Sequence, residues 1–307
     1  MVVVDDGSTD GTAMAAGSAP GRTVGLTIVR AAPRPRGWTG KTWAMAEGLA
    51  AARLSAPDAR YVWLTDADVV HGPDVLAGLV ARAEAGGYDL VSLMVRLRAA
   101  TLAERLLIPA YVFFFQMLYP FAWVRDPGRT TAAAAGGCML VRRAALERIG
   151  GMAAIADAVI DDCALARAIK PGGPIWLGLA GDSTSLRGYP RAADVWRLIA
   201  RSAYTELGHA PARLVLAVIG MGIVYLAPPA LAVAADGWAR VLGAAAWLLM
   251  AATSAPTLAR FGVARGFAVA LPIVALFYVA ATIDSARRFA AGRGGAWKGR
   301  YQAHTRP

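Results

Sequence analysis

Residues 61–68 read Tyr61-Val62-Trp63-Leu64-Thr65-Asp66-Ala67-Asp68, an apolar run rich in β-branched and aromatic residues that ends on two acids. Such a run predicts a β-strand that leads into a polar loop. Similar short apolar runs occur at 2–4, 26–29 and 89–95, and helix-like stretches such as 42–54 and 73–85 lie between them. Because strands that alternate with helices favour a parallel sheet covered on both faces, we expect an α/β fold.

The composition places this chain at a membrane. Its 307 residues are 57% hydrophobic and only 17% charged, with a net charge of +11 and a mean hydropathy of +0.45. Soluble domains carry about 25% charged residues, and a chain this apolar is not disordered as a whole. The two cysteines, Cys138 and Cys163, exclude a disulfide scaffold. Basic charge together with high hydropathy favours an anionic membrane surface as partner over nucleic acid.

The apolar excess is concentrated near the C-terminus. Residues 214–235 form an uncharged run of 22 residues, and 241–258 and 266–283 are uncharged runs of 18 residues each. We therefore expect a membrane region over 211–285 with about three transmembrane helices. The stretch 106–124 is uncharged and aromatic, which favours an interfacial helix over a buried helix of the catalytic domain.

The basic tail, 286–307, creates a conflict with three crossings. It holds arginines and a lysine but no acid, which predicts a cytoplasmic location. Three crossings would place the tail opposite the N-terminal domain. Either one apolar segment is re-entrant or 106–124 also enters the bilayer, and the sequence leaves both options open.

Acidic residues follow two of the predicted strands. Asp5 and Asp6 come after the first strand, and Asp66 and Asp68 come after residues 61–65. In an open parallel sheet, ligands bind at the carboxyl ends of the strands. Two carboxylates one residue apart can hold a divalent cation through hard oxygen ligands, and such a cation stabilises a diphosphate leaving group.

Two further candidates are less specific. Asp161 and Asp162 precede a helix-like stretch, where acids serve either as helix caps or as a general base. Lys41 follows Gly40 in a fragment that is similar to a phosphate-binding loop, but Pro35 stands where that loop needs its first glycine. The lysine can still contact a phosphate from a glycine-rich loop ahead of a helix.

These motifs occur in the order found in family 2 glycosyltransferases. They are 5–12, Gly40-Lys41, Asp66-Ala67-Asp68, 136–143 and Asp161-Asp162-x-x-Leu165. The chain resembles the membrane-attached branch of these enzymes, whose GT-A fold has a Rossmann-like, mostly parallel sheet. Within that branch, 106–143 and 160–177 resemble the hopene-associated glycosyltransferases of bacterial hopanoid synthesis. The resemblance implies a GT-A domain over 1–210.

The resemblance also implies a donor site for a nucleotide-sugar, expected to be a UDP-sugar. Asp5 and Asp6 would contact the uracil and ribose side, and Lys41 would lie near the nucleotide. Asp66 and Asp68 would form the D-x-D motif, with Asp68 ligating the Mg²⁺ or Mn²⁺ that bridges the diphosphate.

On the acceptor side, the resemblance assigns Gly136, Gly137, Cys138 and Asp161 to acceptor binding, and Asp162 to the role of catalytic base in an inverting reaction. The implied acceptor is a lipid or a membrane-proximal molecule, with hopanoid biosynthesis as the process. The implied location is the bacterial inner membrane, with a cytoplasmic catalytic domain. The alternatives are a polyprenyl-phosphate glycosyltransferase and a truncated, non-catalytic membrane protein.

The chain departs from the family pattern in two places. Relatives carry a (Q/R)-x-x-R-W motif ahead of the membrane helices, whereas here Trp196 and Arg197 stand in reversed order, so no role is carried over to Trp196. The family also opens with a strand about 35 residues before the Asp-Asp-Gly motif. We therefore expect the sheet to lack its first strand and the native product to be longer.

Overall fold

The computed structural model describes residues 1–18 and 25–295, and the chain divides into two compact units. The first unit consists of Met1–Ala67, His71–Val95 and Phe121–Asp182, and the second consists of Asp68–Val70, Arg96–Pro120 and the chain from Ser183 onward. Lys298, Arg300 and Arg306 of the predicted basic tail lie outside the described residues.

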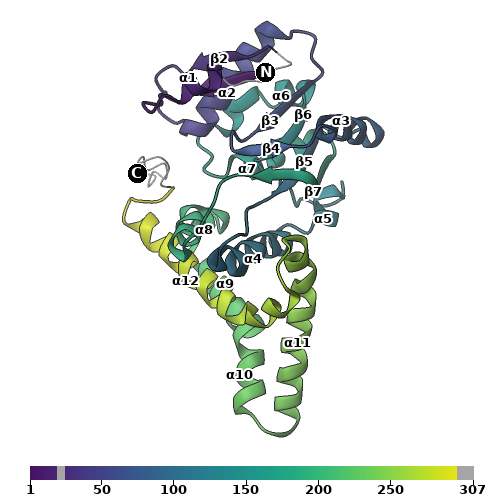
Figure 1. The fold of residues 1–307 in the computed structure, drawn as a ribbon, viewed down its shortest axis with the longest axis vertical. Helices are drawn as coiled ribbons and strands as arrows, with labels where there is room; N and C mark the ends of the chain where they lie inside the picture. Colours follow the sequence, from purple (N-terminus) through teal and green to yellow (C-terminus); the bar gives the residue numbers. More distant parts are fainter. Residues whose placement is uncertain (19–24, 296–307) are drawn as a thin grey trace. The chain divides into compact units, whose positions relative to one another are not determined.

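The strands form two sheets. Strands β1 (Val2–Asp5) and β2 (Thr27–Arg30) pair in parallel, with Val2 opposite Thr27. The other sheet has the order β3 (Tyr61–Thr65), β6 (Cys138–Arg142), β5 (Leu90–Arg96), β7 (Ile175–Ser185) and β4 (Val69–His71). Strand β6 is antiparallel to both of its neighbours, so β3 and β5 run in the same direction (Figure 1). This is the mixed α/β architecture that the alternating strands and helices predict.

Strand β6 lies in the core of the first unit. Four successive residues of β6, Cys138–Val141, are buried. Because successive side chains of a strand point to opposite faces, both faces of β6 are covered. The helical segments of this unit are α1 (Thr12–Ser18), α2 (Gly40–Ser55), α3 (Val75–Gly86), α5 (Phe121–Arg125), α6 (Arg143–Arg148), η1 (Gly151–Ile155), α7 (Asp161–Ile169) and η2 (Lys170–Gly172).

The second unit is helical. It contains α4 (Leu102–Leu118), α8 (Ala192–Glu206), α9 (Pro211–Met221), the π-helical turn η3 (Gly222–Leu226), α10 (Ala227–Ala234), α11 (Gly237–Arg260), η4 (Arg265–Ala270) and α12 (Leu271–Ala290). Among the residues that the structure describes, three stretches are long and apolar enough to cross a membrane, Pro211–Ala234, Gly237–Arg260 and Arg265–Ala290. The prediction of three long apolar segments is confirmed.

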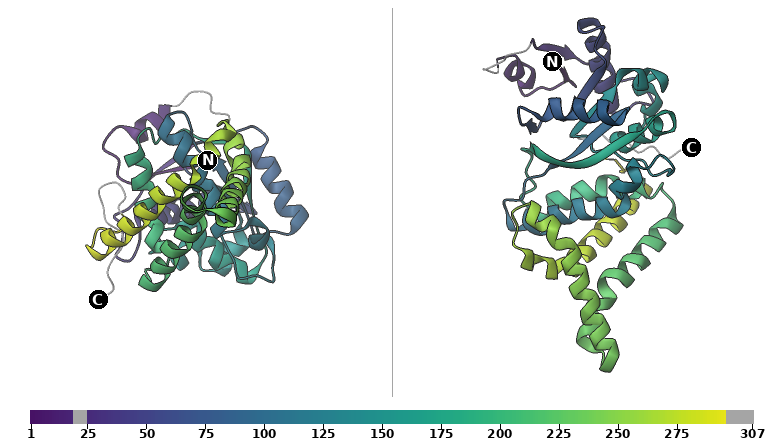
Figure 2. Two further views of the ribbon diagram at one scale, coloured as in Figure 1. Left: turned by 90° about the horizontal axis from the view of Figure 1, so that it is seen from below. Right: turned by 90° about the vertical axis from the view of Figure 1, so that its right-hand side faces the viewer.

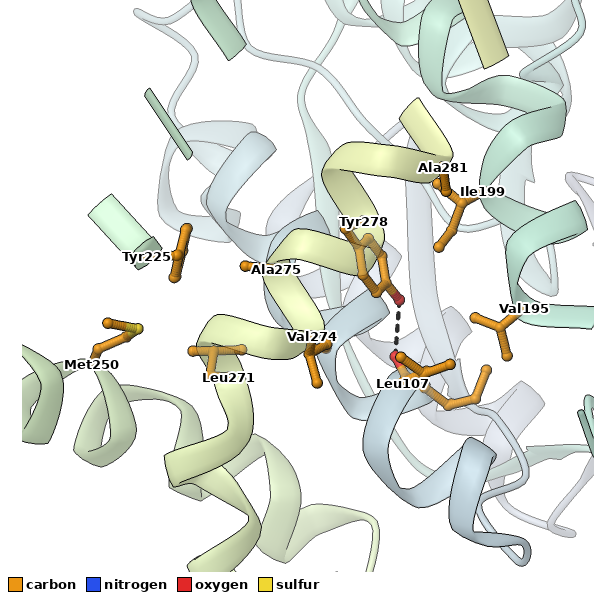
Figure 3. Close-up of a cluster of buried hydrophobic side chains, with 12 residues drawn as sticks. Leu107, Val195, Ile199, Tyr225, Met250, Leu271, Val274, Ala275, Tyr278 and Ala281 are labelled. Atoms are coloured by element: carbon orange, nitrogen blue, oxygen red, sulfur yellow. Dashed lines mark hydrogen bonds between the residues drawn. The ribbon is translucent and has the colours of Figure 1, made fainter. Parts of the chain in front are cut away.

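Helices α4, α8 and α12 share one apolar core (Figure 3). Leu107 and Ile108 of α4 pack with Val195 of α8 and with Tyr278 of α12. The Tyr278 hydroxyl donates a hydrogen bond to the carbonyl oxygen of Leu107 at 2.8 Å. The predicted interfacial stretch 106–124 thus begins in α4, among helices of the second unit, and ends in α5.

Helices α10 and α11 form a closely packed hairpin, visible in the right view of Figure 2. Gly243 of α11 permits this approach, because a Cβ added there would lie 2.7 Å from the Ala232 nitrogen and 2.8 Å from the Pro228 oxygen. Real Cβ atoms are not found so close to backbone atoms, so even alanine must push the two helices apart.

We expect Gly243→Ala to destabilise the hairpin by about 1–3 kcal/mol, the usual cost of overpacking. Thermal unfolding of the purified protein in detergent measures this effect. Gly220→Ala in α9 is the matched control, since no atom lies within 4 Å of its added Cβ and alanine is the better helix former. Equal midpoints for the two variants would contradict the close packing.

Candidate active site

Lys41 joins acids from two other elements of the first unit. Its Nζ lies 3.0 Å from Oδ1 of Asp66 and 3.2 Å from Oδ2 of Asp161. Lys41 stands in the first turn of α2, Asp66 directly follows β3, and Asp161 is the first residue of α7. Three residues that the sequence analysis singled out separately therefore meet at one place.

The start of α2 is fixed by the residue before Gly40. The Thr39 side chain caps the helix by accepting a hydrogen bond from the Thr42 backbone nitrogen at 3.2 Å. The Thr42 hydroxyl lies 2.6 Å from the Ala156 carbonyl oxygen, in the segment that leads to α7. These contacts hold the first turn of α2, and with it Lys41, next to α7.

Asp162 is held by two backbone N–H groups. Its Oδ2 accepts a hydrogen bond from the Gly136 nitrogen and its Oδ1 accepts one from the Cys163 nitrogen, both at 2.8 Å. A Cβ at Gly136 would lie 3.0 Å from Lys41 Nζ and 3.3 Å from Asp162 Oδ2. A glycine at this position therefore leaves room for the lysine and the carboxylate to approach the chain.

The charged groups of this cluster shift one another's pKa values. Burial raises the pKa of Asp162, and the neighbouring Asp161 charge raises it further; Lys41 and the two backbone N–H groups lower it, leaving a pKa of about 6. Burial lowers the pKa of Lys41, but the charges of Asp161, Asp66 and Asp162 more than offset this, so the pKa is raised and the lysine stays protonated. A carboxylate with a pKa near 6 is suited to accept a proton at neutral pH.

A second network connects the end of β3 to the glycine segment. The Thr65 hydroxyl donates to the Gly137 carbonyl oxygen at 3.0 Å and lies 2.8 Å from Nε2 of His71. The indole nitrogen of Trp63 donates to the Cys138 sulfur at 3.4 Å. Thr65 and His71 are the residues that the sequence analysis missed.

The first acidic loop also lies near α2. Asp5 is buried, and its Oδ1 accepts a hydrogen bond from the Ser8 nitrogen at 3.0 Å. A Cβ added at Gly40 would lie 3.1 Å from Oδ2 of Asp6. Asp6 therefore lies beside the residue that precedes Lys41.

Asp68 belongs to the second unit. Its Oδ2 accepts a hydrogen bond from the Ser185 hydroxyl at 2.8 Å, and its backbone oxygen accepts one from the Leu186 nitrogen at 2.7 Å. Among the residues that the structure describes, no three His, Cys, Asp or Glu side chains are grouped so that they could hold a metal ion. Mg²⁺ is commonly held by one or two carboxylates together with substrate phosphates and water, so the available carboxylates fit that type of site.

Comparisons with known proteins agree with the motif order. Residues 1–150 match the family model described as Glycosyl transferase family 2. That range includes all the predicted site residues except Asp161 and Asp162. No match was found among curated proteins.

Among solved structures, the chain is similar to the mannosyltransferase PcManGT from Pyrobaculum calidifontis, determined in complex with GDP-Man and Mn²⁺. The two share 24% sequence identity with a TM-score of 0.50, and the match covers 94% of this chain and 76% of that one. This likeness concerns the fold.

We expect the charge of Lys41 to set the acid limb of the pH–rate profile. Lys41→Met removes a charge that lowers the pKa of Asp162, so that pKa rises and the rate falls off at a higher pH. Sugar transfer at saturating donor, measured between about pH 5 and 8, reports this shift. Lys41→Arg keeps the charge and should keep the wild-type limb; a limb that stays unchanged in Lys41→Met would contradict the coupling.

We expect Thr65→Val to lower kcat on the order of tenfold, because one hydrogen bond near the site contributes about 0.5–1.5 kcal/mol. The substitution leaves the Gly137 carbonyl oxygen and His71 without the Thr65 hydroxyl. Steady-state kinetics would separate kcat from the KM of the donor. Thr65→Ser restores the hydroxyl and should recover the rate, whereas equal rates for valine and serine would rule out a positioning role.

Proposed function

We propose that this chain, whose residues 1–150 match the Glycosyl transferase family 2 model, transfers a sugar from a nucleotide-sugar to an acceptor hydroxyl with Asp162 as the base. The observation that carries the proposal is the cluster of Lys41 with Asp66, Asp161 and Asp162. It combines a basic carboxylate with a fixed positive charge, which are the two groups that sugar transfer from a diphosphate requires.

The reaction is a single displacement with inversion. Asp162 takes the proton of the acceptor hydroxyl, and the oxygen attacks the anomeric carbon from the side opposite the diphosphate. The bond between that carbon and the diphosphate oxygen breaks, and its electron pair leaves with the nucleoside diphosphate. The backbone N–H groups of Gly136 and Cys163 hold the carboxylate in place during the step.

Lys41 acts on the leaving group. Its ammonium contacts Asp66 and Asp161, and a diphosphate that enters beside Asp66 gains this positive charge as its own negative charge develops. A preorganised charge of this kind stabilises the transition state without having to reorient. Asp5 and Asp6 hold the nucleoside, supported by the position of Asp6 next to Gly40.

We assign Asp66 and Asp68 as ligands of a divalent cation, Mg²⁺ or Mn²⁺. Carboxylate oxygens are the ligands that these cations bind. When bound, the metal would neutralise part of the charge on the diphosphate. The similar mannosyltransferase was determined with GDP-Man and Mn²⁺, which supports both a nucleotide-sugar and a divalent metal for this chain.

The acceptor is a lipid or a membrane-proximal molecule. Three stretches long and apolar enough to span a bilayer follow the transferase domain, so the protein is membrane-bound and acts on molecules at the membrane surface. We place it in the bacterial inner membrane with the transferase domain in the cytoplasm. A hydroxylated hopanoid is the acceptor class to which the sequence resemblance points. Gly136, Gly137, Cys138 and Asp161 would line its approach.

The test is release of nucleoside diphosphate from a panel of UDP- and GDP-sugars, with a hydroxylated hopanoid as acceptor and with Mn²⁺ added or chelated. We expect Asp162→Asn to lower turnover at least about 100-fold, as loss of a general base does, with donor binding retained. Asp68→Ala should remove the response to Mn²⁺.

Asp157→Asn is the matched control. Asp157 is an exposed acid five residues before Asp162, and its substitution should leave turnover unchanged. Unchanged turnover in Asp162→Asn would eliminate Asp162 as the base. Transfer without a metal requirement would eliminate the cation.

A further inference from the structure

We propose that α12 lies along the membrane surface instead of crossing the bilayer, so that the chain crosses only twice, through α9–α10 and through α11. The inference rests on the membrane attachment proposed above. Its evidence comes from contacts within the second unit, where α12 is one of three apolar stretches that meet the length and composition of a span.

The C-terminal half of α12 runs along α8. The Phe277 and Trp196 rings lie 5.2 Å apart, and the Trp196 indole nitrogen donates to Oδ2 of Asp284 at 2.8 Å. The contact continues toward the end of the helix, where the Tyr204 backbone nitrogen donates to the Ser285 hydroxyl at 3.1 Å and the Tyr204 and Phe289 rings are 5.6 Å apart. Residues 277–289 therefore lie at the same depth as α8.

Helix α8 cannot lie in the hydrocarbon core. Arg191, the residue before the helix, and Arg197 each form an ion pair with Asp194 in its first turn. The side chains of both arginines are well exposed. Charged side chains inside a bilayer are costly unless they face the interior of a helix bundle or water. Helix α8 thus belongs to the headgroup or aqueous region, and residues 277–289 of α12 belong there with it.

The remainder of α12 and η4 is too short to cross. Residues 265–270 form a 3₁₀ turn and residues 271–276 are α-helical, which together span about 21 Å at rises of about 2.0 and 1.5 Å per residue. The hydrocarbon core is about 30 Å thick. In contrast, the 24 residues of Pro211–Ala234 extend about 36 Å.

The buried fraction also distinguishes the stretch that contains α12 from the other two apolar stretches. Within the structure, 6% of the apolar window of Pro211–Ala234 and 22% of that of Gly237–Arg260 are buried, against 44% for Arg265–Ala290. One side of α12, from Leu271 to Tyr278, packs on α4 and α8 (Figure 3). The other side exposes Ile273, Leu276 and Ile283.

A helix that packs on protein along one face and exposes an apolar stripe elsewhere is suited to lie in one leaflet, with the stripe in contact with lipid. The end of α12 adds charge of the matching sign. Arg287 and Arg288 stand in its last turn and Arg293 follows, and such residues attract anionic headgroups. We therefore take an anionic lipid surface as the partner of this face.

The proposal removes the conflict between the basic tail and three crossings. Two crossings leave the transferase domain and the tail on one side of the membrane, as the arginines of the tail require. The hairpin turn between α10 and α11 then lies on the opposite side. Its Asp236 side chain is 95% exposed and pairs with Arg240 at 3.1 Å, which suits contact with water.

Single cysteines at three exposed positions test this arrangement. They are Leu54→Cys in α2, which is 88% exposed, Asp236→Cys in the hairpin turn, and Arg293→Cys after α12. Each variant is labelled with a membrane-impermeant maleimide in right-side-out and in inverted membrane vesicles. Wild type is the background control, because Cys138 and Cys163 are both buried.

We expect Leu54→Cys and Arg293→Cys to label from the same side and Asp236→Cys to label from the other side. Labelling of Arg293→Cys from the side of Asp236→Cys would show a third crossing and overturn the proposal. Labelling of Asp236→Cys from the side of Leu54→Cys would overturn the two crossings. Trp238→Cys, 81% exposed, and Ala291→Cys repeat the readouts where a first variant fails to accumulate.

Extraction with alkaline carbonate distinguishes this proposal from the one on which it rests. A chain that is washed off the vesicles would refute membrane attachment itself. A chain that stays in the vesicles but labels in the three-crossing pattern would refute only the position of α12.

Discussion

The geometry of the first unit depends on one partly buried positive charge. The ammonium of Lys41 contacts Asp66 and Asp161 and lies close enough to Asp162 to lower its pKa. Without that charge, the carboxylates at the end of β3 and at the start of α7 would repel one another. The lysine therefore makes it possible for the strand, the two helices and the glycine segment to converge, and it also adjusts the carboxylate that we propose as the base.

Local sequence patterns predicted four of the strands that the structure describes, but not β4, β6 or β7 and not the way the strands pair. The runs at 2–4, 26–29, 61–65 and 89–95 correspond to β1, β2, β3 and β5, with ends that differ by at most one residue. Strand β4 was missed because its three residues are too few to show a pattern. The insertion of β6 between β3 and β5, antiparallel to both, depends on contacts between residues more than 40 positions apart, which hydrophobic periodicity does not report.

The candidate site was also predicted only in part, because motifs identify residues but not the contacts between distant ones. Lys41, Asp66, Gly136 and Asp162 could be singled out because each belongs to a short motif, and the structure brings them together. Thr65 acts through a bond to Gly137, 72 positions away in the chain, and no motif reports such a contact. Asp68 was singled out by its motif as well, but its hydrogen bond from Ser185, 117 positions away, could not be read from the sequence.

Hydropathy has a related limit in the second unit. It counts the apolar residues of a segment but not the groups that surround them. Arg265–Ala290 has the same mean hydropathy, 2.2, as Pro211–Ala234, yet their neighbours differ. The first packs along a charged helix and places Asp284 and Ser285 against it, whereas only 6% of the apolar window of the second is buried. A segment that is apolar because it contacts both protein and one leaflet cannot be distinguished by composition from one that is surrounded by lipid. The hydrogen-bond partners of its few polar side chains make that distinction, because a polar group paired with a charged helix must share the depth of that helix.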